Sequence, residues 1–172
     1  YLMGLCIGVH LLNLLCIPAI VLVYYYKKFP NPTMKGTLIA LLVSFAIVGL
    51  MMYGVVQGLV EVCGYFELLF VNTFGMPYNS GVYAFVIILA ASLIWAIWET
   101  MQDEIHPVRM KISFILSIVL LGIPFIGSGY VIAVILTAAL TAYLFMSKKV
   151  NIKMLNTILV CLSVLVVGYS SY

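Results

Sequence analysis

Charged side chains are scarce in this chain of 172 residues: Asp, Glu, Lys and Arg make up 8% of it, whereas hydrophobic residues make up 66%. A soluble domain ordinarily carries about a quarter charged residues and about half apolar ones. A water-soluble globule of this size could not hide so much apolar surface from the solvent. Because the apolar runs are continuous and do not alternate with polar residues, the sequence predicts an all-α, polytopic transmembrane helical bundle.

Several kinds of functional motif are also missing. The four cysteines, Cys6, Cys16, Cys63 and Cys161, show no CxxC pair and no His/Cys ligand spacing, so neither a disulfide framework nor a metal centre is indicated. Cysteines inside apolar runs are expected to act as small buried hydrophobes. No nucleotide-binding glycine loop or nucleophile elbow occurs, and the few basic residues indicate no nucleic-acid partner.

The apolar runs predict six membrane spans, since a helix needs about 20 apolar residues to cross a bilayer core of about 30 Å. The proline and glycines at 122–129 are expected to divide one long run into a tight helical hairpin. The start of the chain lies inside an apolar run without a basic signal-peptide region, which favours an internal part of a longer protein. The predicted spans are residues 1–26, 36–60, 80–98, 111–124, 128–146 and 154–170, and residues 61–79 form an outer interfacial segment.

The basic residues predict the orientation of these spans. All eight Lys and Arg residues lie in the loops 27–35, 109–111 and 148–153, which a six-span topology places on one side of the membrane. The positive-inside rule therefore predicts that these loops are cytoplasmic. The segment 61–79 contains no Lys or Arg, so it is expected on the outer face.

Two polar residues inside the first span are candidates for a site. His10 and Asn13 are three residues apart, which predicts that they share one helix face. Polar groups at membrane depth are costly and call for an explanation. They either line an outward-facing cavity that binds substrate or transfers protons, or simply bond to a neighbouring helix.

The outer segment supplies the other candidates, and two of the chain's five acids lie in or beside it. An outward-facing carboxylate is suited to act as a general base, to bind a substrate hydroxyl or to coordinate a divalent metal. The alternative is that both glutamates point into water beyond the headgroups. Asn79 or Ser80 is expected to cap the span that follows. The candidate residues here are Gln57, Glu61, Glu67 and Asn72.

Two further features have ordinary structural interpretations. The connection at 99–106 contains Glu99, Asp103, Glu104 and His106, and it is interpreted as a solvated acidic loop rather than a metal cluster. Small residues predict close helix packing within the bundle, and Gly54 and Gly58, four residues apart, are expected to form one ridge for close approach.

Several strings resemble a known family when they are taken together. In order, they are Gly8-Val9-His10-Leu11-Leu12-Asn13-Leu14-Leu15, Gln57-Gly58-Leu59, Phe66-Glu67-Leu68-Leu69-Phe70-Val71-Asn72, Asn79-Ser80-Gly81 and Gly168-Tyr169-Ser170-Ser171. They resemble a bacterial, Bacteroidetes-type multi-pass membrane family that is related to the protein O-mannosyltransferases of the GT-C glycosyltransferase superfamily. The resemblance covers essentially the whole chain, as an internal part of the family's membrane domain.

The resemblance implies an enzyme of the bacterial inner membrane that takes a sugar from a polyprenyl-phosphate carrier and transfers it to a protein hydroxyl on the extracytoplasmic face. GT-C enzymes carry a key acidic residue in the first extracytoplasmic loop, and no residue of this chain can be matched to it. No catalytic base is therefore assigned. Two alternatives stay open: a transporter or channel subunit with an intramembrane relay through His10 and Glu61, and a structural subunit without chemistry.

Overall fold

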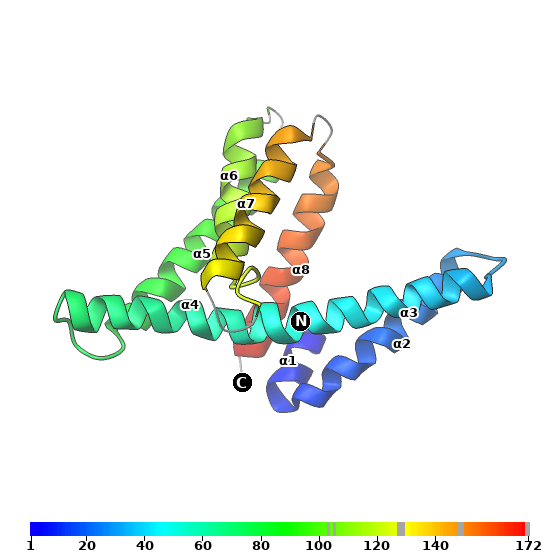
Figure 1. Cartoon of the computed structure of the whole chain (residues 1–172), viewed down its shortest axis with the longest axis horizontal. Coiled ribbons are helices and arrows are strands. Elements are labelled where there is room, and N and C mark those ends of the chain that lie inside the picture. Colours follow the sequence, from blue (N-terminus) through cyan, green and yellow to red (C-terminus); the bar gives the residue numbers. More distant parts are fainter. Residues whose placement is uncertain (103, 105, 127–129, 148–149, 171–172) are drawn as a thin grey trace. The chain divides into compact units, whose positions relative to one another are not determined.

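The computed structural model describes residues 1–102, 104, 106–126, 130–147 and 150–170, and every regular element in these ranges is a helix (Figure 1). This confirms the predicted all-α class. The elements, in chain order, are α1 (Leu2–Val9), the 3₁₀ helix η1 (Leu11–Leu15), α2 (Cys16–Lys28), α3 (Met34–Gly49), the π-helix η2 (Leu50–Val56), α4 (Gln57–Leu68), the π-helix η3 (Leu69–Thr73), α5 (Ser80–Met101), α6 (Pro107–Leu120), α7 (Tyr130–Met146) and α8 (Ile152–Ser170).

Within the described residues, four helical stretches are long and apolar enough to cross a membrane: Leu11–Lys28, Met34–Thr73, Ser80–Met101 and Ile152–Ser170. In α5 only 28% of the most apolar window is buried, so most of its apolar side chains face outward. Outward-facing apolar side chains along such helices are suited to lipid contact. The chain is thus a helical membrane protein, and the count of six spans stays a prediction.

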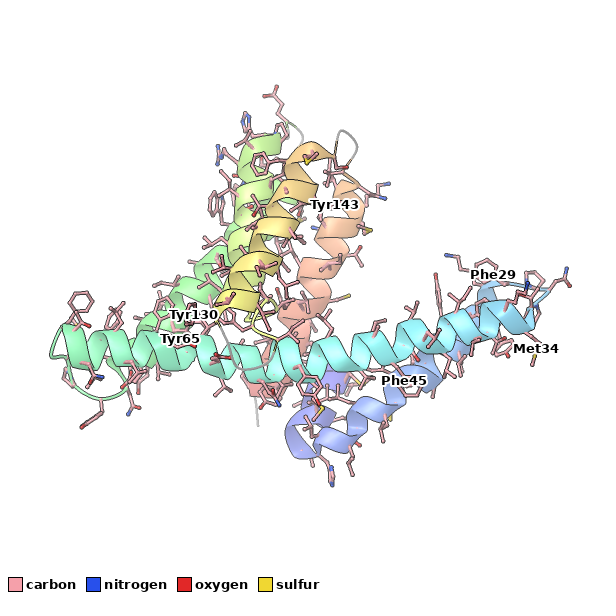
Figure 2. The ribbon with its side chains drawn as sticks, in the orientation of Figure 1. Phe29, Met34, Phe45, Tyr65, Tyr130 and Tyr143 are labelled. Atoms are coloured by element: carbon pink, nitrogen blue, oxygen red, sulfur yellow. The ribbon has the colours of Figure 1, made fainter. Side chains whose placement is uncertain are left out.

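Two compact units make up the chain: Tyr1–Met52 with Ser163–Tyr172, and Tyr53–Leu162. In the first unit, α2 and α3 form a helical hairpin (Figure 1). The Thr33 hydroxyl caps α3 by accepting a hydrogen bond from the Gly36 amide at 3.1 Å. Phe29 and Met34, on either side of the connecting loop, are exposed (Figure 2).

The first unit also contains a close crossing between α1 and the end of α8. A side chain at Gly4 would clash with the backbone of Leu165, and one at Gly168 would clash with the backbone of Tyr1. Glycine at both positions therefore lets the two backbones approach each other, as small residues do in membrane helix pairs.

The second unit is built on α5, which packs against α6 on one side and α4 on another. The Ser117 hydroxyl of α6 donates a hydrogen bond to the Ser92 carbonyl of α5 at 3.1 Å. Gly58 of α4 lies against the backbone of Gly122, so close that an added side chain would clash. The buried apolar side chains of α5 and α6 include Phe85, Leu89, Leu93, Ala96, Met110, Phe114 and Ile118.

The helix that begins at Met34 differs from its expected length. It was expected to end near residue 60, but helical residues continue to Thr73 through two π-helical stretches. π-helical segments inside α-helices accommodate an extra residue without ending the helix. The expected outer segment 61–79 is therefore mostly a continuation of this helix, followed by a turn that leads into α5.

At 122–129, where a hairpin was expected, the described residues show a turn. Helix α6 ends at Leu120, Gly122 takes a left-handed conformation with φ +77°, and α7 begins at Tyr130. Glycine adopts this conformation without steric cost. Residues 127–129 of the predicted hairpin lie outside the described part of the chain.

The expectation that cysteines in apolar runs are buried is wrong. Cys6, Cys16 and Cys161 are exposed, and Cys63 is half-buried. The physical reason is that a membrane helix is apolar on its lipid-facing side as well as on its protein-facing side. An apolar run therefore does not indicate which side chains another helix covers.

Candidate functional site

The first helical segment of the first unit is interrupted at His10. His10 has extended dihedral angles, φ −151° and ψ 115°, between α1 and η1. Its Nδ1 atom accepts a hydrogen bond from the Leu12 amide at 3.2 Å, so the imidazole caps the second helical piece. The expectation that His10 and Asn13 share one face of a continuous helix is therefore wrong, because the helix stops and restarts between them.

Asn13 fixes the other side of the interruption. Its side-chain amide donates a hydrogen bond to the Cys6 carbonyl at 2.6 Å, and the His10 amide donates to the same carbonyl at 2.9 Å. The last carbonyls of a helix have no partner within that helix, and side-chain donors commonly satisfy them. Asn13 therefore joins the end of α1 to η1, while the His10 side chain is exposed.

This interrupted helix has the form that binding sites in membrane proteins often take, because an interruption frees backbone groups for a ligand. Interrupted backbone at membrane depth is stable only where protein groups or water satisfy it. Here His10 and Asn13 supply two of the needed bonds. Both residues that the sequence singled out thus take part in the interruption, and the Asn13 amide also donates to the His10 carbonyl at 2.9 Å.

Glu67, in the second unit, has a clear structural task. Its two carboxylate oxygens accept hydrogen bonds from the amides of Asn79 at 2.6 Å and Val82 at 3.2 Å, at the N-terminus of α5. An anion is stabilised at a helix N-terminus by the free amides and the helix dipole. Asn79 occupies the capping position, but its side chain makes no capping bond. The expectation that Asn79 or Ser80 caps this helix is therefore replaced by a cap from Glu67.

The remaining candidates of the outer segment are more open. Glu61 accepts a hydrogen bond from the Tyr65 hydroxyl at 2.8 Å, one turn further along α4. Gln57 and Asn72 are exposed. Of these candidates, Glu61 and Glu67 belong to one helical stretch, and their site roles stay predictions.

A buried acid that the sequence did not single out lies near the end of α5. Glu99 is only 2% exposed, and its Oε1 atom accepts a hydrogen bond from the Trp95 indole N–H at 2.9 Å. The same oxygen forms a salt bridge of 2.6 Å with Arg109 of α6, whose side chain is 60% exposed. The interpretation of 99–106 as a solvated acidic loop is therefore wrong for Glu99. It holds for the exposed Glu104 and His106, and Asp103 lies outside the described residues.

The sequence contained a weak signal for this cluster. Trp95 and Glu99 are four residues apart, the spacing at which helical side chains meet. Nothing in the sequence indicates that Arg109 reaches back across Pro107 to the same carboxylate. That contact depends on how α6 packs against α5.

Among the grooves on the described surface of the second unit, two are candidates for ligand binding. One holds about 600 Å³ and is lined by residues of the buried cluster and its neighbours, namely Ala91, Ile94, Trp95, Trp98, Glu99 and Arg109. The other holds about 700 Å³ and has an almost wholly apolar lining that includes Val119, Phe125, Tyr130 and Ala133. Thr137 and Thr141 also line the second groove, but their hydroxyls donate to carbonyls of their own helix.

A metal site is not formed by the residues that the structure describes. Among them, no group of three or more His, Cys, Asp or Glu side chains is placed to hold a metal ion. Glu67 has both oxygens engaged with backbone amides, so its bonds serve the α4–α5 connection.

Comparison with known families adds one finding. Residues 1–33 match the protein O-mannosyl-transferase TMEM260 N-terminal domain. The matched residues form α1, η1, α2 and the whole loop between α2 and α3, and they include the interruption at His10 and Asn13. No curated protein and no solved structure matches the chain. The relationship to an O-mannosyltransferase family thus rests on this N-terminal segment.

Proposed function

We propose that this chain is the membrane-embedded part of a GT-C-like glycosyltransferase. The observation that carries the proposal is the match of residues 1–33 to an O-mannosyltransferase domain. This segment contains the interrupted helix, whose exposed His10 and exposed backbone turn are the features of the first unit best suited to bind a polar ligand.

The proposed donor is a sugar linked to polyprenyl phosphate, and the proposed acceptor is a protein hydroxyl. A helical membrane protein meets such a donor within the lipid phase. The apolar groove of about 700 Å³ in the second unit is suited to a hydrocarbon chain, since its threonine hydroxyls are already bonded within their own helix. We place the transfer on the extracytoplasmic face of a bacterial inner membrane, with the basic loops 27–35, 109–111 and 148–153 in the cytoplasm.

The residues have unequal parts in this proposal. His10 and Asn13 line the polar site in the first unit, and Gln57, Glu61 and Asn72 are accessible candidates in the second. Glu67 acts by holding the start of α5 and so positions the outer segment. The catalytic base stays unassigned.

The direct test is a transfer assay with the complete encoded protein, including any sequence that adjoins these residues. The protein is reconstituted in liposomes with radiolabelled polyprenyl-phosphate mannose and a peptide rich in Ser and Thr. We expect the label to move to the peptide. His10→Ala should reduce the transfer at least about tenfold, the effect of losing one well-formed hydrogen bond to the reacting ligand.

Leu12→Ala is the matched control. The Leu12 side chain is 65% exposed, and only its backbone amide takes part in the cap, which alanine retains. Its transfer should equal that of the parent protein. Absence of transfer, combined with a proton flux in dye-loaded liposomes that requires both His10 and Glu61, would contradict the enzyme and support a relay instead.

A further inference from the structure

We infer that His10 is a fixed hydrogen-bond donor to a ligand hydroxyl, through its Nε2–H group, and that it is not a general base. The inference rests on the proposed function, because it names the part that His10 plays in binding a sugar. It follows from the hydrogen bonds of the interrupted helix.

The cap on η1 determines the tautomer of the His10 imidazole. A backbone amide is always a donor, so the bond from the Leu12 amide requires His10 Nδ1 to be an acceptor and therefore unprotonated. In a neutral imidazole the single proton must then be on Nε2. The cap thus selects one tautomer, and the exposed side chain presents an N–H group.

The interruption also changes which donors the neighbouring backbone carbonyls receive. In a continuous α-helix the amides of Leu12 and Asn13 would donate to the carbonyls of Gly8 and Val9. Here the Leu12 amide donates to His10 Nδ1, and the Asn13 amide donates to the His10 carbonyl at 2.9 Å. The carbonyls of Gly8 and Val9 have therefore lost their usual helical donors.

The His10 N–H donor lies within one turn of chain of the Gly8 and Val9 carbonyls, neither of which receives a hydrogen bond from the Leu12 or Asn13 amide. A hydroxyl group both donates and accepts, so it satisfies both kinds of partner. A phosphodiester has no hydrogen-bond donor, and every phosphate carries negative charge at neutral pH, which the C-terminal end of α1 disfavours. A sugar hydroxyl thus fits this set better than a phosphate oxygen does.

The cap on η1 excludes a role for His10 as a general base. Accepting a proton at Nδ1 would break the cap on η1, and Nε2 already carries a proton. Neither nitrogen is therefore free to take a proton from a substrate or a relay while the cap is intact. The role that remains is donation, which orients a ligand oxygen.

The tautomer is measured by nitrogen-15 NMR of the complete protein in detergent, with labelled histidine. Comparison with the spectrum of His10→Gln identifies the His10 signals among all histidines of the complete protein, His106 included. We expect the two nitrogen signals of the His10 ring to show an unprotonated Nδ1 and a protonated Nε2. The opposite tautomer, or an imidazolium, at neutral pH would overturn the inference regardless of any transfer activity.

The ligand class is tested by titrating the same sample with methyl α-mannoside and, separately, with inorganic phosphate. We expect the Nε2 signal of His10 to move with the sugar and to stay in place with phosphate. A response to phosphate alone, or to neither probe, would overturn the assignment of a hydroxyl ligand.

Two variants separate the cap from the donor. His10→Asn retains an acceptor near the position of Nδ1 and so keeps the cap on η1, but it lacks the Nε2–H group. His10→Gln has the opposite properties, because it places an amide N–H near the position of Nε2 and loses the cap. We expect His10→Asn to weaken mannoside binding about tenfold and His10→Gln to retain more of the affinity. Greater loss in His10→Gln than in His10→Asn would contradict a donor role. A correct tautomer and sugar response without any transfer would contradict the proposed enzyme and leave this binding role intact.

Discussion

The buried cluster at the end of α5 predicts an asymmetric response to mutation. Glu99 is 2% exposed and Arg109 is 60% exposed, although they form one salt bridge. Removing Glu99 leaves an arginine that water already reaches. Removing Arg109 leaves a buried carboxylate whose other described bond comes from the Trp95 indole. The second change should therefore destabilise the protein more than the first.

The magnitudes follow from the burial of each partner. Breaking a fully buried ion pair from one side costs about 3–5 kcal/mol, whereas exposed pairs contribute about 1 kcal/mol or less. Because one partner here is buried and the other is exposed, we expect Arg109→Gln to cost about 2–3 kcal/mol. Glu99→Gln retains an acceptor for the Trp95 indole and should cost about 1 kcal/mol. The double variant should cost less than the sum of the two, since it leaves no unpaired charge in the cluster.

Unfolding by sodium dodecyl sulfate in mixed micelles measures these costs, with helix content followed by circular dichroism. Tryptophan fluorescence gives a local reading, since both tryptophans of the chain, Trp95 and Trp98, line the groove beside Glu99. Equal costs for the two single variants, or an additive double variant, would refute the reasoning, because either result means that the Glu99 carboxylate does not depend on Arg109.

Three further predictions concern helix packing and capping, and each is read from the same unfolding measurement. Gly58→Ala should destabilise the protein by about 1–3 kcal/mol, since the added methyl group meets the backbone of the α6–α7 turn, whereas Gly64→Ala in the same helix meets nothing within 4 Å and should be neutral or stabilising. Glu67→Gln should cost about 1 kcal/mol through the weaker cap on α5, and Glu61→Gln, which alters one exposed hydrogen bond, should cost less. Gly168→Leu should separate α1 from α8 and cost more than about 2 kcal/mol; a stable variant would contradict the close crossing of the two helices.

The sequence alone determined the class of this protein. The scarcity of charge and the length of the apolar runs exclude a soluble globule on composition, because lipid is the only solvent that tolerates so much apolar surface. The sequence also identified His10 and Asn13 as polar residues that needed an explanation, and it predicted close packing at Gly58. These inferences need only the identity of each residue and the local geometry of a helix.

The tertiary structure decided which of these residues bond to one another. The break at His10 could not be predicted from the sequence, since GVHLLNLL contains neither a proline nor a pair of glycines. The His10 side chain can cap η1 only when the His10 backbone is already extended. The capping role of Glu67 depends on a chain reversal that brings the start of α5 back to α4. Glu99 seemed to belong to a solvated loop because Arg109 lies ten residues away in the sequence, and only the packing of α6 on α5 joins the two. Hydropathy thus determines whether a helix lies in lipid or in water. The pairing of its few polar groups depends instead on contacts between residues that are far apart along the chain.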